Sequence, residues 1–225
     1  MPVTNLAARL PGIETVRRWS QSLAVLDAIL SPEWSFRYFS FNARWGDDQM
    51  ASMRNGSGDE YSIVFASEGA YLRGFDHESA MSPFGREPPR PWPGVVDEVP
   101  IGFQRFVAEP FFCIGEVPAV TVCLWRLAGD SAWRHGAVTL PTAEGDPDGA
   151  DWLFEELDGR AETYRSYARD YFEKEIELAA ISHVYDQRPL TDEVVSELNP
   201  DISLADLIED LHEIQYRGAG ANQPG

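Results

Sequence analysis

The clearest hydrophobic pattern in the chain lies between residues 13 and 30. Apolar side chains recur there at alternating steps of three and four residues, at Val16, Trp19, Leu23, Leu26 and Leu30. This spacing places them on one stripe of an amphipathic helix. Pro32 follows, and a proline disfavours helical geometry at the residue before it. We therefore expect a helix over residues 13–30 that covers one face of a sheet.

Residues 34–44 carry aromatic side chains with the period of two that is typical of a β-strand. One face holds Trp34, Phe36 and Tyr38, and the other holds Phe39 and Phe41. The strand is therefore either buried on both faces at its far end or interrupted by a bulge. In both cases we expect it to be internal in the sheet.

Further stretches extend the expected sheet. Residues 61–66 and 70–75 flank a glycine-containing turn and predict a hairpin. Residues 111–114 and 119–127 are also expected to be strands. The second of these is apolar on both faces, so we expect it to be central in the sheet.

From residue 151 onward the pattern becomes helical. Helices are expected over residues 161–172 and 178–185, and another begins after the N-cap residue Thr191. Ser203 caps the last helix. Strands followed by helices predict an α+β fold with a mostly antiparallel sheet of about five strands, helices packed on it, an N-terminal helix and a helical C-terminal third.

The expected domain organisation is simple. Residues 1–217 are expected to form one α+β domain. The proline-rich segment 85–100 is where a subdivision would fall, although Trp92 within it is expected to pack back on the domain. Residues 218–225 are expected to be a disordered tail.

Acidic residues outnumber basic residues by 37 to 18, which gives a net charge of −19. The excess is concentrated after residue 143, where 21 acidic residues face 6 basic ones. A surface of this sign repels phosphate backbones, so we expect no direct binding to nucleic acid. It attracts basic proteins over long distances, although solubility alone also explains such a charge. The outward residues of the last helix are the expected contacts for a basic protein partner, namely Asp206, Glu209, Asp210 and Glu213.

The expected location is the cytoplasm, with no membrane span. No stretch approaches the roughly 18 uninterrupted apolar residues that a span needs, and the first residues lack a basic segment followed by an apolar run. Cys113 and Cys123 have no neighbours at metal-ligand spacing, so they are expected to be buried free thiols. We expect no cofactor. The oligomeric state is left open.

One short cluster has the composition of a catalytic site. Asp76, His77 and Glu78 follow the second strand of the expected hairpin, where chain reversals bring polar side chains to a sheet edge. They could act as general acid and base or supply part of a metal site. The other histidines do not complete the roughly three ligands that a catalytic zinc needs, so no metal site is assigned. The alternative is a turn in which an Asp side chain caps backbone amides.

Several segments together resemble a family of uncharacterised bacterial single-domain proteins. They are residues 50–61 (MASMRNGSGDEY), 74–79 (GFDHES), 124–126 (LWR) and 188–191 (RPLT). The family has no established activity, so the resemblance implies none for this chain. The small, acidic character is also similar, in a general way, to that of bacterial immunity and antitoxin-like proteins, which neutralise a toxin by binding it.

These observations favour a noncatalytic protein-binding module, for example an immunity-type inhibitor of a basic toxin or effector, over an enzyme. In this hypothesis the acidic C-terminal helices bind the partner. The alternative is a metal-dependent hydrolase that uses Asp76, His77 and Glu78. Its motivation is the clustering of these residues at the end of an expected strand.

Overall fold

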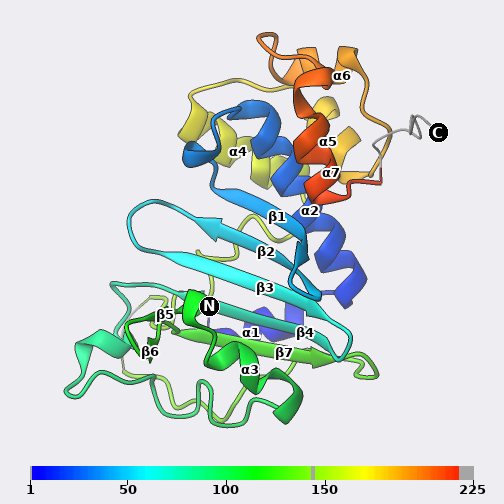
Figure 1. Ribbon diagram of the computed structural model, residues 1–225. Helices are drawn as coiled ribbons and strands as arrows, with labels where there is room; N and C mark the ends of the chain where they lie inside the picture. Colours follow the sequence, from blue (N-terminus) through cyan, green and yellow to red (C-terminus); the bar gives the residue numbers. More distant parts are fainter. Residues whose placement is uncertain (1, 143–144, 218–225) are drawn as a thin grey trace.

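The computed structural model of the protein describes residues 2–142 and 145–217 and is built around a five-stranded antiparallel sheet (Figure 1). The strands lie in the order β1-β2-β3-β4-β7. Their bounds are β1 Phe39–Trp45, β2 Asp48–Arg54, β3 Glu60–Ala66, β4 Gly69–Phe75 and β7 Val122–Leu127. The expected α+β fold is confirmed, as is the hairpin, which is β3–β4. The tail expected over residues 218–225 lies outside the described residues.

Side chains of the central strands alternate between two hydrophobic cores, one on each face of the sheet. In β3, Ile63 belongs to the larger core and Val64 to the smaller. In β4, Leu72 and Tyr71 divide in the same way. All four side chains are fully buried. β3 and β4 therefore read as continuous apolar runs because both of their faces are covered.

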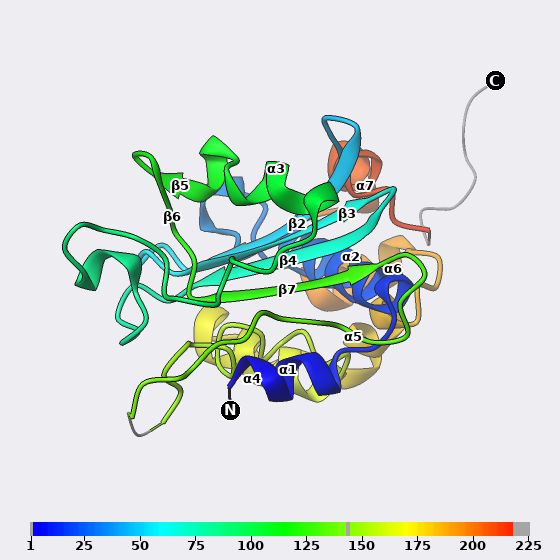
Figure 2. The ribbon, with the colours of Figure 1, turned by 90° about the horizontal axis from the view of Figure 1, so that it is seen from below.

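Helices cover the face of the larger core (Figure 2). They are α1 Val3–Arg9, α2 Ile13–Leu30, α4 Ala161–Phe172, α5 Leu178–Tyr185, α6 Asp192–Leu198 and α7 Ile208–Ile214. The expected bounds of α2, α4 and α5 are confirmed. Among the described residues, no helix combines the length and the apolar character needed to cross a membrane.

α2 lies at the centre of this helical layer and binds the C-terminal helices. The hydroxyl of Ser22 donates to the carbonyl of Val184 in α5 at 3.1 Å, and the amide of Gln21 donates to the carbonyl of Ile214 in α7 at 3.0 Å. Buried side-chain hydrogen bonds to main-chain carbonyls fix the register of one helix on another. The hydrogen bond from Gln21 therefore fixes α2 against α7.

The two predicted caps in the C-terminal helices are confirmed. The Thr191 side chain accepts from the amide of Val194 at 3.3 Å and begins α6. Ser203 forms a capping box with Asp206. The segment after this box is a 3₁₀ turn, Leu204–Leu207, before α7 begins. Ile208, at the start of α7, is 64% exposed because this turn shifts the helical phase.

Irregular chain covers the opposite face of the sheet (Figure 2). It contains the short helix α3 Gln104–Val107 and the two-residue strands β5 Cys113–Ile114 and β6 Val117–Pro118. Trp92 packs against the smaller core, as expected, and its indole N–H donates to the carbonyl of Thr139 at 2.9 Å. The domain bounds and the subdivision near residues 85–100 stay predictions.

The expectation of a strand from Trp34 is wrong. Residues Trp34–Phe36 form a 3₁₀ turn, and β1 begins only at Phe39. The carboxylate of Asp27 in α2 accepts the amides of Tyr38 and Phe39 at 2.8 and 2.9 Å. This contact ties the start of β1 to α2 and leaves the preceding turn on the surface.

The positions expected for two strands are also wrong, because β1 and β7 are the edges of the sheet. β7 is apolar on both faces because both cores extend to this edge. Its outer side is protected by a bridge in which Trp125 and Arg134 exchange hydrogen bonds of 2.9 and 2.8 Å. Burial of both faces therefore does not determine the position of a strand in the sheet.

Candidate functional site

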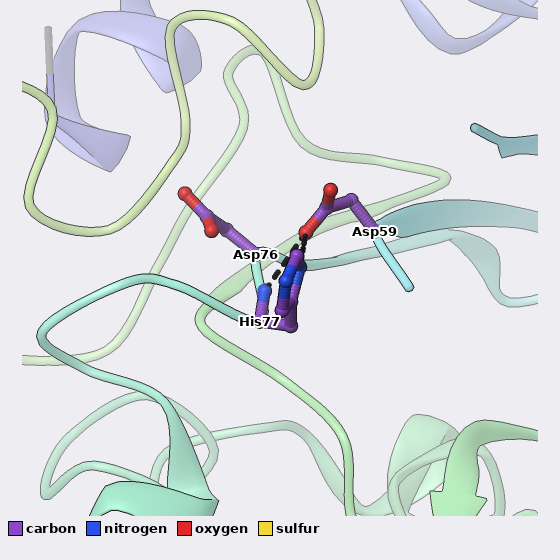
Figure 3. A group of neighbouring side chains, drawn as sticks. All are labelled: Asp59, Asp76 and His77. Carbon is purple, nitrogen blue, oxygen red and sulfur yellow. Dashed lines mark hydrogen bonds and ion pairs between the residues drawn. The ribbon is translucent and has the colours of Figure 1, made fainter. Parts of the chain in front are cut away.

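The hairpin β3–β4 brings two acidic residues together that lie far apart in the sequence. Glu60, the first residue of β3, pairs with Phe75, the last residue of β4. Asp59 precedes the first and Asp76 follows the second, so both carboxylates lie at the same end of the sheet. Both residues are buried, with 7% and 8% of their surface exposed. His77 follows directly, and Figure 3 shows its ring turned toward Asp59.

Asp59 and His77 form a close pair. The ring Nδ1 of His77 lies 2.6 Å from Asp59 Oδ1, and the His77 amide donates to the same oxygen at 2.9 Å. This ring hydrogen bond raises the pKa of His77 above its ordinary value. Burial raises the pKa of Asp59, but the hydrogen bonds from His77 and Asn55 outweigh it and hold that pKa below its usual value.

Asp76 makes a different set of contacts. Its Oδ1 accepts the amide of Glu78 at 3.0 Å, and its Oδ2 accepts the indole N–H of Trp152 at 3.0 Å. The side chain therefore caps a turn, as the alternative interpretation of the sequence predicted. Gly149, with φ +78°, packs against this side chain, and a Cβ at that position would lie 2.6 Å from the Cβ of Asp76.

The cluster differs in one member from the predicted one. Ligating atoms of Asp59, Asp76 and His77 all lie within 4.8 Å of one another. Glu78 is exposed and does not belong to this group. Sequence reasoning missed Asp59 because it considered only the consecutive residues 76–78. The predicted hairpin could have revealed Asp59, because strand pairing places the residue before β3 beside the residue after β4.

The Asp59–His77 pair has a definite chemical capacity. Asp59 holds the Nδ1 side of the ring, and 42% of the His77 side chain is exposed. An imidazole oriented in this way can exchange a proton through Nε2 or, when neutral, ligate a metal ion. The structure therefore supplies an oriented histidine and two carboxylates at one end of the sheet.

The four acidic residues expected to bind a partner have different environments. Asp206 accepts from the Ser203 side chain at 2.7 Å within the capping box. Asp210 pairs with Arg37 at 2.5 Å, and only 8% of the Arg37 side chain is exposed. Glu209 and Glu213 are exposed and form no ion pair among the described residues. Because they are four positions apart, they lie on one face of α7.

Exposed aromatic side chains lie beside this face. Trp34 and Phe36 are 62% and 59% exposed, and Tyr171, whose hydroxyl donates to the carbonyl of Phe36 at 3.0 Å, is 39% exposed. Trp34 lines one small hollow together with Asp210 and Glu213 of α7. We name the set Trp34, Phe36, Tyr171, Glu209 and Glu213 the aromatic–acidic surface. Sequence reasoning missed its aromatic members because it placed Trp34 and Phe36 in a strand.

Comparison with known proteins does not identify the chain. No protein-family model matches it, and neither a curated protein nor a solved structure does. The resemblance to a bacterial family therefore stays an expectation.

Proposed function

We propose that this protein is a noncatalytic protein-binding module whose aromatic–acidic surface binds a basic segment of a partner protein. The observation that carries the proposal is the exposure of Trp34 beside the carboxylates of Asp210 and Glu213 in α7, with Phe36 exposed two positions further along the chain. Large aromatic side chains supply most of the binding energy in many protein interfaces, and a surrounding charged rim governs partner choice and association rate. A partner segment that presents an apolar side chain between lysines or arginines matches this surface.

The charge of the whole chain supports the same partner. The net charge is −19, and the acidic excess lies mainly after residue 143, in the part of the chain that contains α7. Such a field raises the association rate of a basic protein and weakens as salt is added. An immunity-type inhibitor that neutralises a basic toxin or effector in the bacterial cytoplasm is the form of this function that the general similarity suggests.

The test begins with affinity capture of the tagged protein from its own cell lysate. The washes contain about 50 mM or about 500 mM salt, which shortens the Debye length roughly threefold. A captured partner is then titrated against variants. Trp34→Ala is expected to weaken binding by about tenfold or more, and Glu209→Gln with Glu213→Gln is expected to slow association at low salt.

Two matched controls separate this surface from general effects. Ile101→Ala removes a side chain that is 91% exposed on the other face of the molecule. Glu193→Gln with Glu197→Gln neutralises an exposed pair with the same spacing on α6. Both controls should bind normally. If Trp34→Ala and the α7 variant bind as tightly as the unchanged chain, the proposal is wrong.

A hydrolase is the second candidate, now with Asp59 in place of Glu78. The specific observation is the 2.6 Å contact between Asp59 and His77, which orients a histidine as a general base does. The test is a panel of ester, phosphoester and peptide substrates with His77→Ala as the comparison. Equal turnover by both proteins would end this candidate.

A further inference from the structure

We propose that Asp59, Asp76 and His77 bind a divalent transition-metal ion, with Zn²⁺ as the preferred one. The three side chains offer two oxygen donors and one nitrogen donor, and these atoms lie within 4.8 Å of one another. Main-chain geometry brings them together, because Asp59 and Asp76 flank a paired position of β3 and β4. Two of the donors are therefore held at the ends of paired strands, and His77 directly follows the second of them.

Charge at the cluster favours a bound cation. Asp59 and Asp76 are both buried, and neither forms an ion pair with an arginine or lysine among the described residues. Thr121 accepts the amide of Asp76 and donates to the carbonyl of Asp148, which is also buried. Buried carboxylates in proteins are usually paired with cations or coordinate metals. His77 is neutral when it ligates a metal, so a divalent ion would offset the charge of both carboxylates.

Neighbouring side chains already hold the two carboxylates. The amide of Asn55 donates to Asp59 Oδ2 at 2.7 Å, and the indole of Trp152 donates to Asp76 Oδ2 at 3.0 Å. Hydrogen bonds of this kind to the outer atoms of ligating carboxylates orient them in metal sites. Asp59 can offer Oδ1 to the ion and keep its Asn55 contact at Oδ2, and the His77 ring then loses its proton and exchanges its contact with Oδ1 for the ion. Asp76 already uses both oxygens, so it exchanges its contacts with Glu78 and Trp152 for the ion when it turns.

The required movement is small. Donors on one tetrahedral zinc lie about 3.4 Å apart, given bond lengths of about 2.1 Å. The contact between Asp59 and His77 is shorter than this, at 2.6 Å, and the widest separation in the group is under 4.8 Å. Figure 3 shows the Asp76 carboxylate directed away from His77, so rotation of this side chain supplies most of the change. The His77 side chain is 42% exposed, so we expect the ion to enter from this side and to keep a water as its fourth ligand.

The donor set favours a transition metal over calcium or magnesium. Ca²⁺ takes about six to eight oxygen ligands, and Mg²⁺ keeps most of its waters. Imidazole is a ligand typical of zinc, iron, copper and nickel. An ion held partly by His77 is therefore expected to be Zn²⁺, and Ca²⁺ should compete poorly.

The experiment is a titration of the full chain, freed of metal by a chelator, with Zn²⁺ and separately with Ca²⁺, followed by calorimetry. We expect one equivalent of Zn²⁺ to bind with micromolar or tighter affinity. His77→Gln and Asp59→Asn, which keep hydrogen-bonding side chains in place, should each lower this affinity by roughly tenfold or more. Absorption of bound Co²⁺ gives a second measurement, and its spectrum should change in both variants even where folding is unaltered.

The controls are Glu78→Gln, which removes the adjacent exposed carboxylate, and His135→Gln, which removes a histidine elsewhere. Both should bind Zn²⁺ normally. Substoichiometric Zn²⁺ binding, equal affinity in His77→Gln, or an equal loss in His135→Gln would overturn the proposal. The site does not depend on the protein-binding function. Zinc binding without any hydrolysis would support the proposed metal site and rule out the hydrolase.

Discussion

Arg73 is the largest charged side chain in the interior, with 1% of its surface exposed in the middle of β4. It pairs with Glu60, donates to the carbonyl of Ala119 at 2.5 Å and stacks on the ring of Phe112 at 4.7 Å. Removing Arg73 takes away all of these buried contacts at once and leaves Glu60 with only the more exposed Arg54 as its partner. We expect Arg73→Ala to lower the free energy of unfolding by about 3–5 kcal/mol.

Urea unfolding measures this loss. Arg54→Ala is the matched control, because Arg54 pairs with the other oxygen of Glu60 at 3.4 Å but 42% of its side chain is exposed. It should cost less than about 1 kcal/mol. Equal losses in the two variants would show that burial of Arg73 does not matter.

Asp27 makes the stability of the fold depend on pH. Burial raises the pKa of Asp27 to about 7, although hydrogen bonds from Phe39, Tyr164 and Tyr38 lower it. The folded chain therefore holds this proton more tightly than the unfolded chain, in which the carboxyl has its ordinary pKa of 3.8. The resulting stability is fully present below about pH 4 and is lost as the pH rises through about 7.

We expect the free energy of unfolding to fall by a few kcal/mol between about pH 4 and about pH 7. Asp27→Asn keeps the shape of the side chain without a charge. When the free energy of unfolding is measured with denaturant across this pH range, its dependence on pH should be weaker in this variant. Part of the slope will remain, because burial also raises the pKa of Glu156 to about 7. Identical slopes before and after the substitution would refute this role of Asp27.

The sequence predicted the helices better than the order of the strands, because helices depend on local spacing and strand order does not. The bounds of α2, α4 and α5 agree with expectation because an amphipathic helix is specified by local spacing. The order of strands depends on contacts between distant segments, so the edge positions of β1 and β7 could not be read from their apolar faces. The same limit explains the candidate site. His77 and Asp76 were found as sequence neighbours, whereas Asp59 joins them only through strand pairing.

The turn between β3 and β4 depends on a glycine for its contact with β7. Gly69 has φ +143°, and a Cβ added there would lie 2.1 Å from the carbonyl oxygen of Arg126. We expect Gly69→Ala to cost about 2–3 kcal/mol, since backbone strain and a clash add together. Gly46→Ala tests strain alone, because φ is +61° there and no atom lies within 4 Å. Thermal unfolding should show the larger loss for Gly69→Ala, and equal losses would contradict the clash.

The net charge of −19 lowers the stability of the folded protein. Self-repulsion destabilises a folded chain of high charge, and salt screens it. Raising sodium chloride from about 20 mM to about 300 mM should stabilise the fold by about 1 kcal/mol, which corresponds to a rise in Tm of about 2–4 °C. Potassium chloride should act equally in calorimetry, because screening depends on ionic strength alone. A Tm that falls with salt would contradict the prediction.

The pairing of α2 with α5 and α7 has a consequence for synthesis. The hydrogen bond from Gln21 to Ile214 joins residues 193 positions apart. At about 5–20 residues per second, a ribosome needs roughly 10–40 s to make the intervening chain. During that interval the apolar stripe of α2 lacks its C-terminal partners. The larger core can therefore close completely only after translation of the last helix, and we expect its apolar residues to be partly exposed on the nascent chain until then.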